Sequence, residues 1–170
     1  MTYLGRDCGN QRPSIEGNSI LSGRMKVAVA FDHRGVALRE ATIAALTGHE
    51  VIDLGTHDAS VRVDYPDKAR EVGEAIQSGQ AERGIIVCGS GAGAAIAACK
   101  MTGIRAAICH DLYSAHQAVE HDDMNVLSSV RRSSGRRSRV SSSAFFLLHA
   151  STAGTGTSLG WRRLPPWKRR

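Results

Sequence analysis

Short apolar segments alternate with segments of helical periodicity along the middle of the chain. The apolar segments are typical of buried parallel strands, and they cover Lys26–Phe31, Glu50–Leu54, Ile85–Cys88, Ile104–Cys109 and Met124–Leu127. Helices are predicted between them, over Val36–Leu46, from Pro66 to Ile76, from the turn at 89–93 to about Met101, and over Tyr113–Glu120. This alternation predicts an α/β fold of the Rossmann-like, three-layer α/β/α kind, with a five-stranded parallel sheet and right-handed crossovers.

The alternation ends after Leu127. Residues 128–143 hold eight serines and five arginines without a helical or strand period, so they offer little apolar surface to offset the entropy of ordering. Residues 128–170 carry ten Lys and Arg and no Asp or Glu, whereas residues 1–127 carry 12 basic and 16 acidic side chains. The net charge of +6 therefore combines a part at −4 with a tail at +10.

The sequence thus divides into three parts. Residues 1–24 are predicted to be a disordered N-terminal extension, and Met25, directly before the first strand, stays open as an alternative start. Residues 25–127 are predicted to form the α/β domain. Residues 128–170 are predicted to be an irregular, basic, low-complexity tail, and the abrupt loss of carboxylates leads to the hypothesis that this tail is read in a shifted frame.

The cysteines and the hydrophobic runs bear on the cellular compartment. Cys8, Cys88, Cys99 and Cys109 lack the paired spacing of a metal site, and Cys99 and Cys109 are expected in the core as reduced thiols. No apolar run approaches the roughly 20 residues that cross a bilayer, and the N-terminus lacks the apolar centre of a signal peptide. We therefore expect a cytoplasmic protein with neither membrane contact nor a metal site.

A glycine-rich turn follows the third strand. Gly89, Gly91 and Gly93 alternate with Ser90 and Ala92, and an alanine-rich helical segment comes next. Such a turn can direct several backbone N–H groups at one point, which suits a phosphate or a developing oxyanion. Cys88 ends the strand, so the same N–H groups are expected to favour its thiolate, which would serve as a base or nucleophile. The alternative interpretation of Cys88 is a small buried hydrophobe.

Four blocks, in order, resemble motifs of the type B ribose-5-phosphate isomerases, a family related to the subunits of galactose-6-phosphate isomerase. They are Asp32-His33-Arg34-Gly35, Asp64-Tyr65-Pro66, Cys88–Gly93, and Tyr113-Ser114-Ala115 with His121–Asn125. The resemblance covers Met25 to Leu127. It implies an aldose–ketose isomerase of the pentose phosphate pathway that interconverts ribose 5-phosphate and ribulose 5-phosphate through an enediolate, with no metal and no organic cofactor. Pentose phosphate is the default substrate, and a hexose or tetrose phosphate stays open.

The resemblance also implies roles for individual residues. Cys88 would be the base that moves the proton, and His121 would shuttle the ring-opening proton, a task that suits an imidazole. Asp122 occupies a position where the family usually has a sugar-contacting asparagine, so an acceptor is kept and a donor is lost. The remaining substrate-binding residues implied are Asp32, His33, Tyr65, Gly89, Ser90, Gly91, Ala92 and Gly93. The plainer alternatives are surface histidines for His33 and His121 and a packed loop aromatic for Tyr65.

The tail changes what is expected of this chain. Family members continue past the fifth strand with an arginine-bearing turn, a long helix and a basic segment that reaches a neighbouring subunit's phosphate site. The match here ends at Leu127, so we expect a weakened or inactive isomerase, and a homodimer or homotetramer only if the C-terminus permits. Two other functions stay open. One is a non-catalytic phosphosugar-binding α/β protein, and the other, disfavoured because charge runs are usually solvated, is a nucleic-acid binder using the basic tail with Trp161 and Trp167.

Overall fold

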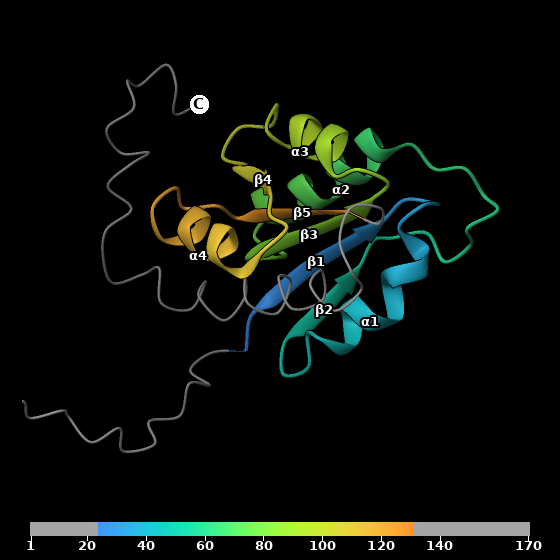
Figure 1. Ribbon diagram of the computed structural model, residues 1–170, viewed down its shortest axis with the longest axis horizontal. Coiled ribbons are helices and arrows are strands. Elements are labelled where there is room, and N and C mark those ends of the chain that lie inside the picture. Colours follow the sequence, from blue (N-terminus) through green and yellow to red (C-terminus); the bar gives the residue numbers. More distant parts are fainter. Residues whose placement is uncertain (1–23, 131–170) are drawn as a thin grey trace, which may run out of the picture.

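The computed structural model describes residues 24–130, which form one parallel five-stranded sheet (Figure 1). The strand order is β2-β1-β3-β5-β4. The strands are β1 (Lys26–Phe31), β2 (Glu50–Asp53), β3 (Arg83–Cys88), β4 (Ala106–Ile108) and β5 (Val126–Val130). The five-stranded parallel sheet predicted from the apolar segments is confirmed, and β3 lies at its centre.

Helices cover both faces of the sheet, as the alternation predicted. They are the 3-10 turn η1 (Val36–Leu38), α1 (Arg39–Ala44), α2 (Tyr65–Gln77), α3 (Ala92–Ala98) and α4 (Leu112–Glu120). Figure 1 shows α2 and α3 on one side of the strands and α1 and α4 on the other. The single helix expected over Val36–Leu46 is instead a 3-10 turn followed by a short α-helix.

Each face of the sheet has its own apolar core, because successive strand residues point to opposite faces. On one face Phe31, Ile85 and Leu127 pack with Leu46 and Val119. On the other face the residues are smaller, mainly alanines of β1, α2 and α3, and Cys88 lies among them. The second core therefore reaches the carboxyl edge of β3 directly beneath the glycine-rich turn.

Two expectations need correction. Strand β5 runs to Val130, three residues past the predicted end of the domain, because Ser128 and Ser129 are buried and pair with Ile86 and Val87 of β3. These three residues therefore belong to the sheet and not to an irregular tail. Cys99, expected in the core, is exposed beyond the end of α3, whereas Cys109 is buried as predicted.

The remaining sequence-based predictions on chain organisation lie outside the described residues. They concern the N-terminal extension up to residue 23 and the basic tail from residue 131 onward. Within residues 24–130, every helix is too short or too polar to cross a membrane.

Candidate active site

Three segments meet at the carboxyl edge of the sheet. They are the turn at 32–35 after β1, the loop at 54–64 after β2, and the glycine-rich turn at 89–93 after β3. The backbone N–H of Asp32 donates to the carbonyl of Val87 at 3.2 Å, which ties the first turn to the last residues of β3. Three of the four sequence blocks named above are therefore brought together in space.

Tyr65 lies against the glycine-rich turn. A Cβ placed on Gly93 would come within 2.7 Å of two carbons of the Tyr65 ring, a contact that real Cβ atoms do not make. Glycine at this position therefore allows the ring of the first α2 residue to rest on the backbone that follows Cys88. Since Tyr65 is still 43% exposed, it packs on the turn and keeps a face open to a ligand.

Cys88 is the last residue of β3 and is 4% exposed. Its sulfur accepts a hydrogen bond from the backbone N–H of Gly91 at 3.1 Å. Burial raises the pKa of the thiol, and the nearby Asp32 carboxylate adds to this, while the N–H groups of Gly91, Ser90 and Ala94 act in the opposite direction. The N–H groups of the turn do favour the thiolate, as expected, but the effect of burial is larger, so the pKa of Cys88 is raised overall.

Gly91 fixes the shape of the turn. Its φ of 77° lies in the left-handed region that favours glycine. Its carbonyl accepts hydrogen bonds from the Ser128 hydroxyl at 2.7 Å and from the Ala95 N–H at 3.0 Å. Sequence reasoning missed Ser128, because the strand pattern appeared to end one residue earlier.

Asp32 is a buried carboxylate with a structural task of its own. It is 4% exposed, and its Oδ1 accepts from the backbone N–H groups of Arg34 at 2.9 Å and Gly35 at 2.8 Å. These two bonds close the turn after β1. They also offset the free-energy cost of burying a carboxylate, which is large when the group has no hydrogen-bond partner.

A cavity of about 430 Å³ opens between the first turn and the loop after β2. It is lined by Asp32, His33, Arg34, Ser60, Arg62, Val63, Asp64 and Tyr65. The Nδ1 atom of His33 lies 3.1 Å from the Val63 carbonyl oxygen and 3.4 Å from the Val63 nitrogen, so it joins the two walls. Cys88 is not among the residues that line this cavity.

Some of the lining was not predicted. The sequence did not assign five lining residues to the site, although two of them, Arg34 and Asp64, belong to motifs that resemble the family: Arg34, Ser60, Arg62, Val63 and Asp64. Among the residues described, no three His, Cys, Asp or Glu side chains gather in a way that could hold a metal ion.

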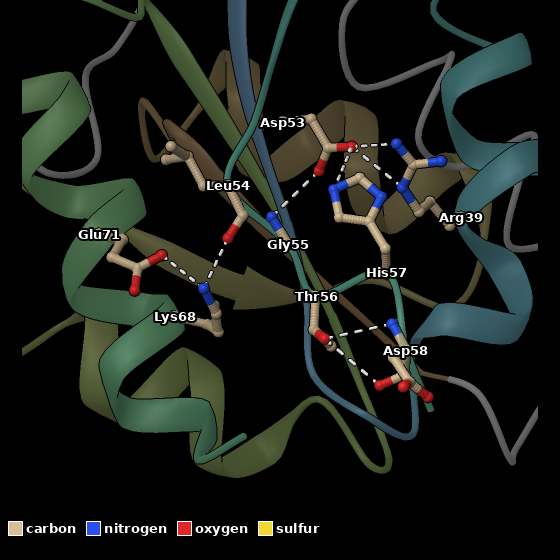
Figure 2. Close-up of polar contacts among 9 residues, drawn as sticks. All are labelled: Arg39, Asp53, Leu54, Gly55, Thr56, His57, Asp58, Lys68 and Glu71. Atoms are coloured by element: carbon tan, nitrogen blue, oxygen red, sulfur yellow. Dashed lines mark hydrogen bonds and ion pairs between the residues drawn. The ribbon is translucent and has the colours of Figure 1, made fainter. Parts of the chain in front are cut away.

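The loop that carries half of the cavity wall is anchored at its base (Figure 2). Asp53 accepts from the Arg39 Nε at 3.0 Å, from the Arg39 Nη2, and from the Gly55 N–H at 3.0 Å. On the other side, Lys68 of α2 donates to the Leu54 carbonyl at 2.7 Å and also pairs with Glu71. Helices α1 and α2 therefore both hold the start of this loop.

His121 and Asp122 lie far from Cys88 within one chain. They follow α4, which returns from the carboxyl edge of β4 to the amino edge where β5 begins (Figure 1). The next residue, Asp123, pairs at 2.8 Å with Arg105, directly before β4. The two residues implied by the resemblance therefore do not share a cleft with Cys88 within one chain, because a helix between parallel strands must end at the opposite edge of the sheet.

Comparison with known proteins gives a consistent picture. The model of the ribose/galactose isomerase family matches residues 27–155, which extends beyond Leu127. A putative sugar phosphate isomerase of Bacillus subtilis is 44% identical over 106 residues, covering 61% of this chain and 71% of that protein. Ribose-5-phosphate isomerase B of Escherichia coli is 45% identical over 105 residues, covering 61% and 70%.

Solved structures agree in fold, and other relatives differ in substrate. Ribose-5-phosphate isomerase B of Clostridium thermocellum superposes with a TM-score of 0.68 at 41% identity, covering 76% of this chain and 93% of that one. A 4-deoxy-4-sulfo-D-erythrose isomerase of Clostridium is 38% identical over 106 residues, covering 61% and 67%. The matching proteins therefore share isomerase names but not one sugar.

Proposed function

The chain belongs to the ribose/galactose isomerase family, and on that premise we propose that it is an aldose–ketose isomerase of phosphorylated sugars. Ribose 5-phosphate, converted to ribulose 5-phosphate, is the first substrate to test. The observation that carries the proposal is the convergence of Cys88, the Asp32 turn and the Tyr65 ring at one edge of the sheet. A cytoplasmic place in the pentose phosphate pathway is part of the same proposal.

Cys88 is the proposed base. As thiolate it takes the proton from C2 of the open-chain aldose, which leaves an enediolate with its negative charge on O1. A proton then moves from the C2 hydroxyl to O1, and the thiol returns its own proton to C1, which gives the ketose and restores the thiolate. The Ser90 hydroxyl and the N–H groups of the turn are the proposed donors to the enediolate oxygen. The Gly91 N–H already donates to the Cys88 sulfur, so its main proposed role is to stabilise the thiolate.

His121 and Asp122 are proposed to act in the site of a second copy of the chain. Both are exposed at the amino edge of the sheet, so they cannot share a cleft with the Cys88 of their own chain. A second copy could present its His121 imidazole to the sugar ring oxygen and donate the ring-opening proton. This assembly, a homodimer or a homotetramer, makes each site depend on two copies.

The substrate panel follows from the names of the relatives, with a tetrose phosphate added because the sequence left that substrate class open. It contains ribose 5-phosphate, galactose 6-phosphate, erythrose 4-phosphate and 4-deoxy-4-sulfo-D-erythrose, and conversion of each aldose to its ketose is measured with the full chain. We expect ribose 5-phosphate to be converted, at a rate below the usual ~1 to 1,000 per second if the atypical tail weakens the site. Conversion of none of the four would contradict the proposal.

Substitution of Cys88 separates catalysis from binding. Cys88→Ala should reduce turnover of the preferred sugar phosphate by ~100-fold or more while sparing its affinity, because only the proton-transferring group is removed. Cys99→Ala is the matched control, since that thiol is exposed and lies beyond α3. Retained turnover in Cys88→Ala would refute the assigned base, whereas ligand binding without any turnover in the unmodified chain would favour the non-catalytic binder.

A further inference from the structure

We propose that Arg34, together with Arg62, binds the phosphate group of the sugar substrate in the cavity beside the glycine-rich turn. This inference rests on the proposed function, because it assumes a phosphorylated ligand at this edge of the sheet. It assigns the charge recognition to two side chains on facing walls of one cavity. Neither residue was expected in the site from the sequence.

Both the backbone and the side chain of Arg34 make contacts that define its position. Its backbone N–H donates to the buried Asp32 carboxylate at 2.9 Å, so the main chain cannot turn away from the cavity. Its side chain runs along Gly89, where an added Cβ would lie 3.0 Å from the Arg34 Cδ and 3.4 Å from Nη1. The guanidinium therefore lies beside Gly89, the residue that follows Cys88.

Arg62 lies on the loop wall of the same cavity. Its Nε is 3.6 Å from Asp64 Oδ1, and both side chains are largely exposed, at 85% and 68%. An exposed ion pair at this distance contributes little to stability, and separating its two side chains costs little free energy. Arg62 can therefore turn toward a phosphate dianion. His33, held by Val63 between the two arginines, provides a further nitrogen at the junction of the walls.

The two carboxylates that line the cavity do not prevent Arg34 and Arg62 from binding a phosphate. Asp32 Oδ1 is already occupied by two backbone N–H groups, and the side chain is buried. Asp64 has Arg62 as its neighbour and can exchange it for water when a phosphate arrives. Planar guanidinium groups bind phosphate through paired charge-assisted hydrogen bonds, and the cavity of about 430 Å³ falls in the range of small-ligand sites.

The experiment compares Arg34→Gln, Arg34→Lys and Arg62→Gln with Arg70→Gln. Arg70 is the matched control, because it is an exposed arginine of α2 whose partners are Asp67 and Glu74. For Arg34→Gln we expect KM for the preferred sugar phosphate to rise about tenfold or more, with a much smaller change in kcat. Arg34→Lys keeps the positive charge but lacks the paired N–H donors of a guanidinium. Its KM should therefore lie between that of the unmodified chain and that of Arg34→Gln.

Titration of the full chain with inorganic phosphate gives a readout that does not depend on turnover. The unmodified chain and Arg70→Gln should bind phosphate equally, whereas Arg34→Gln and Arg62→Gln should each bind it at least several-fold more weakly. Circular dichroism of each variant checks the fold, and Arg62→Gln and Arg34→Lys keep the test informative if Arg34→Gln is unfolded.

Unchanged KM and phosphate affinity in the folded arginine variants would overturn the inference while leaving the proposed isomerase intact. Arginine-dependent phosphate binding without turnover would support the inference and count against the isomerase.

Discussion

At Cys88 two physical effects oppose each other. Burial raises the pKa of the thiol above its ordinary value, and three backbone N–H groups of the turn lower it without compensating fully. A base must be deprotonated to act. We therefore expect the Cys88 thiol to be mostly protonated near neutral pH, so that only a minor fraction of the proposed base is ionised before substrate binds.

The resulting pH dependence can be measured directly. If Cys88 is the base, kcat/KM should rise up to tenfold per pH unit from about pH 7 and still be rising at about pH 9, the ordinary range of a thiol pKa. Burial is the main reason that the pKa of Cys88 is raised, and the Asp32 charge adds to it. Asp32→Asn keeps an acceptor for the turn but removes that added charge, so the rise in kcat/KM should move to lower pH. A profile that is flat above pH 7, or that Asp32→Asn leaves in place, would contradict this assignment.

Cys109 allows a separate test of burial, away from the proposed chemistry. Burial raises the pKa of this thiol to about 11, and the charge of Asp111 adds to the effect. Since the folded-state pKa lies above the unfolded one, the stabilisation is fully present below about pH 9 and is lost as pH rises toward about 11.

Chemical denaturation at a series of alkaline pH values measures this loss. The free energy of unfolding should fall by about 2 kcal/mol more in the unmodified chain than in Cys109→Ala across that window. Cys99→Ala serves as the control because its thiol is exposed. Parallel curves for the unmodified chain and Cys109→Ala would mean that the thiol ionises equally easily in both states.

At the scale of elements, the strand pattern could be predicted but its ends could not. Strands and helices follow from apolar alternation, which is a property of many residues together. The end of β5 depends on Ser128 and Ser129, whose burial the sequence does not signal, because one hydroxyl is satisfied by a carbonyl from the distant glycine-rich turn. Cys99 was misplaced for a related reason, since α3 ends one residue before it.

That hydroxyl predicts an element-level effect on the turn. Ser128→Ala removes the donor to the Gly91 carbonyl, and it should destabilise the domain by about 1 kcal/mol and lower kcat more than it raises KM. The reason is that the turn holding the Cys88 sulfur loses its link to β5. Ser129→Ala, a neighbouring buried position on the other face of the strand, is the control. Equal effects of the two substitutions would show that the bond to Gly91 has no special role.

The candidate site could be predicted in part from the sequence, and topology explains what was missed. The blocks at Asp32, Tyr65 and Cys88 each follow a strand or begin the helix behind it, so the parallel sheet brings them to one edge. His121 follows a helix and precedes a strand, which places it at the other edge. The order of blocks in the chain suggests one site, whereas the crossover connection places His121 at the edge of the sheet opposite to Cys88.

At the scale of the whole molecule, this distribution predicts complementation between two inactive variants. Cys88→Ala and His121→Ala should each have low activity alone. In a mixed dimer one site combines both substitutions, while the other combines an intact Cys88 with an intact His121. Random mixing should therefore restore roughly a quarter of the unmodified activity, because half of the dimers are mixed and each has one intact site of two.

The measurement requires exchange of subunits, by joint refolding or by co-expression with different tags, followed by assay of the ribose 5-phosphate reaction. Mixing Cys88→Ala with itself is the baseline, and Cys99→Ala mixed with His121→Ala corrects for dilution of intact chains. If His121 acted on the Cys88 of its own chain, the mixed dimer would have no intact site and no activity would return. Full activity of His121→Ala alone would instead remove the imidazole from the mechanism, leaving each chain with a site built entirely at one edge of its sheet.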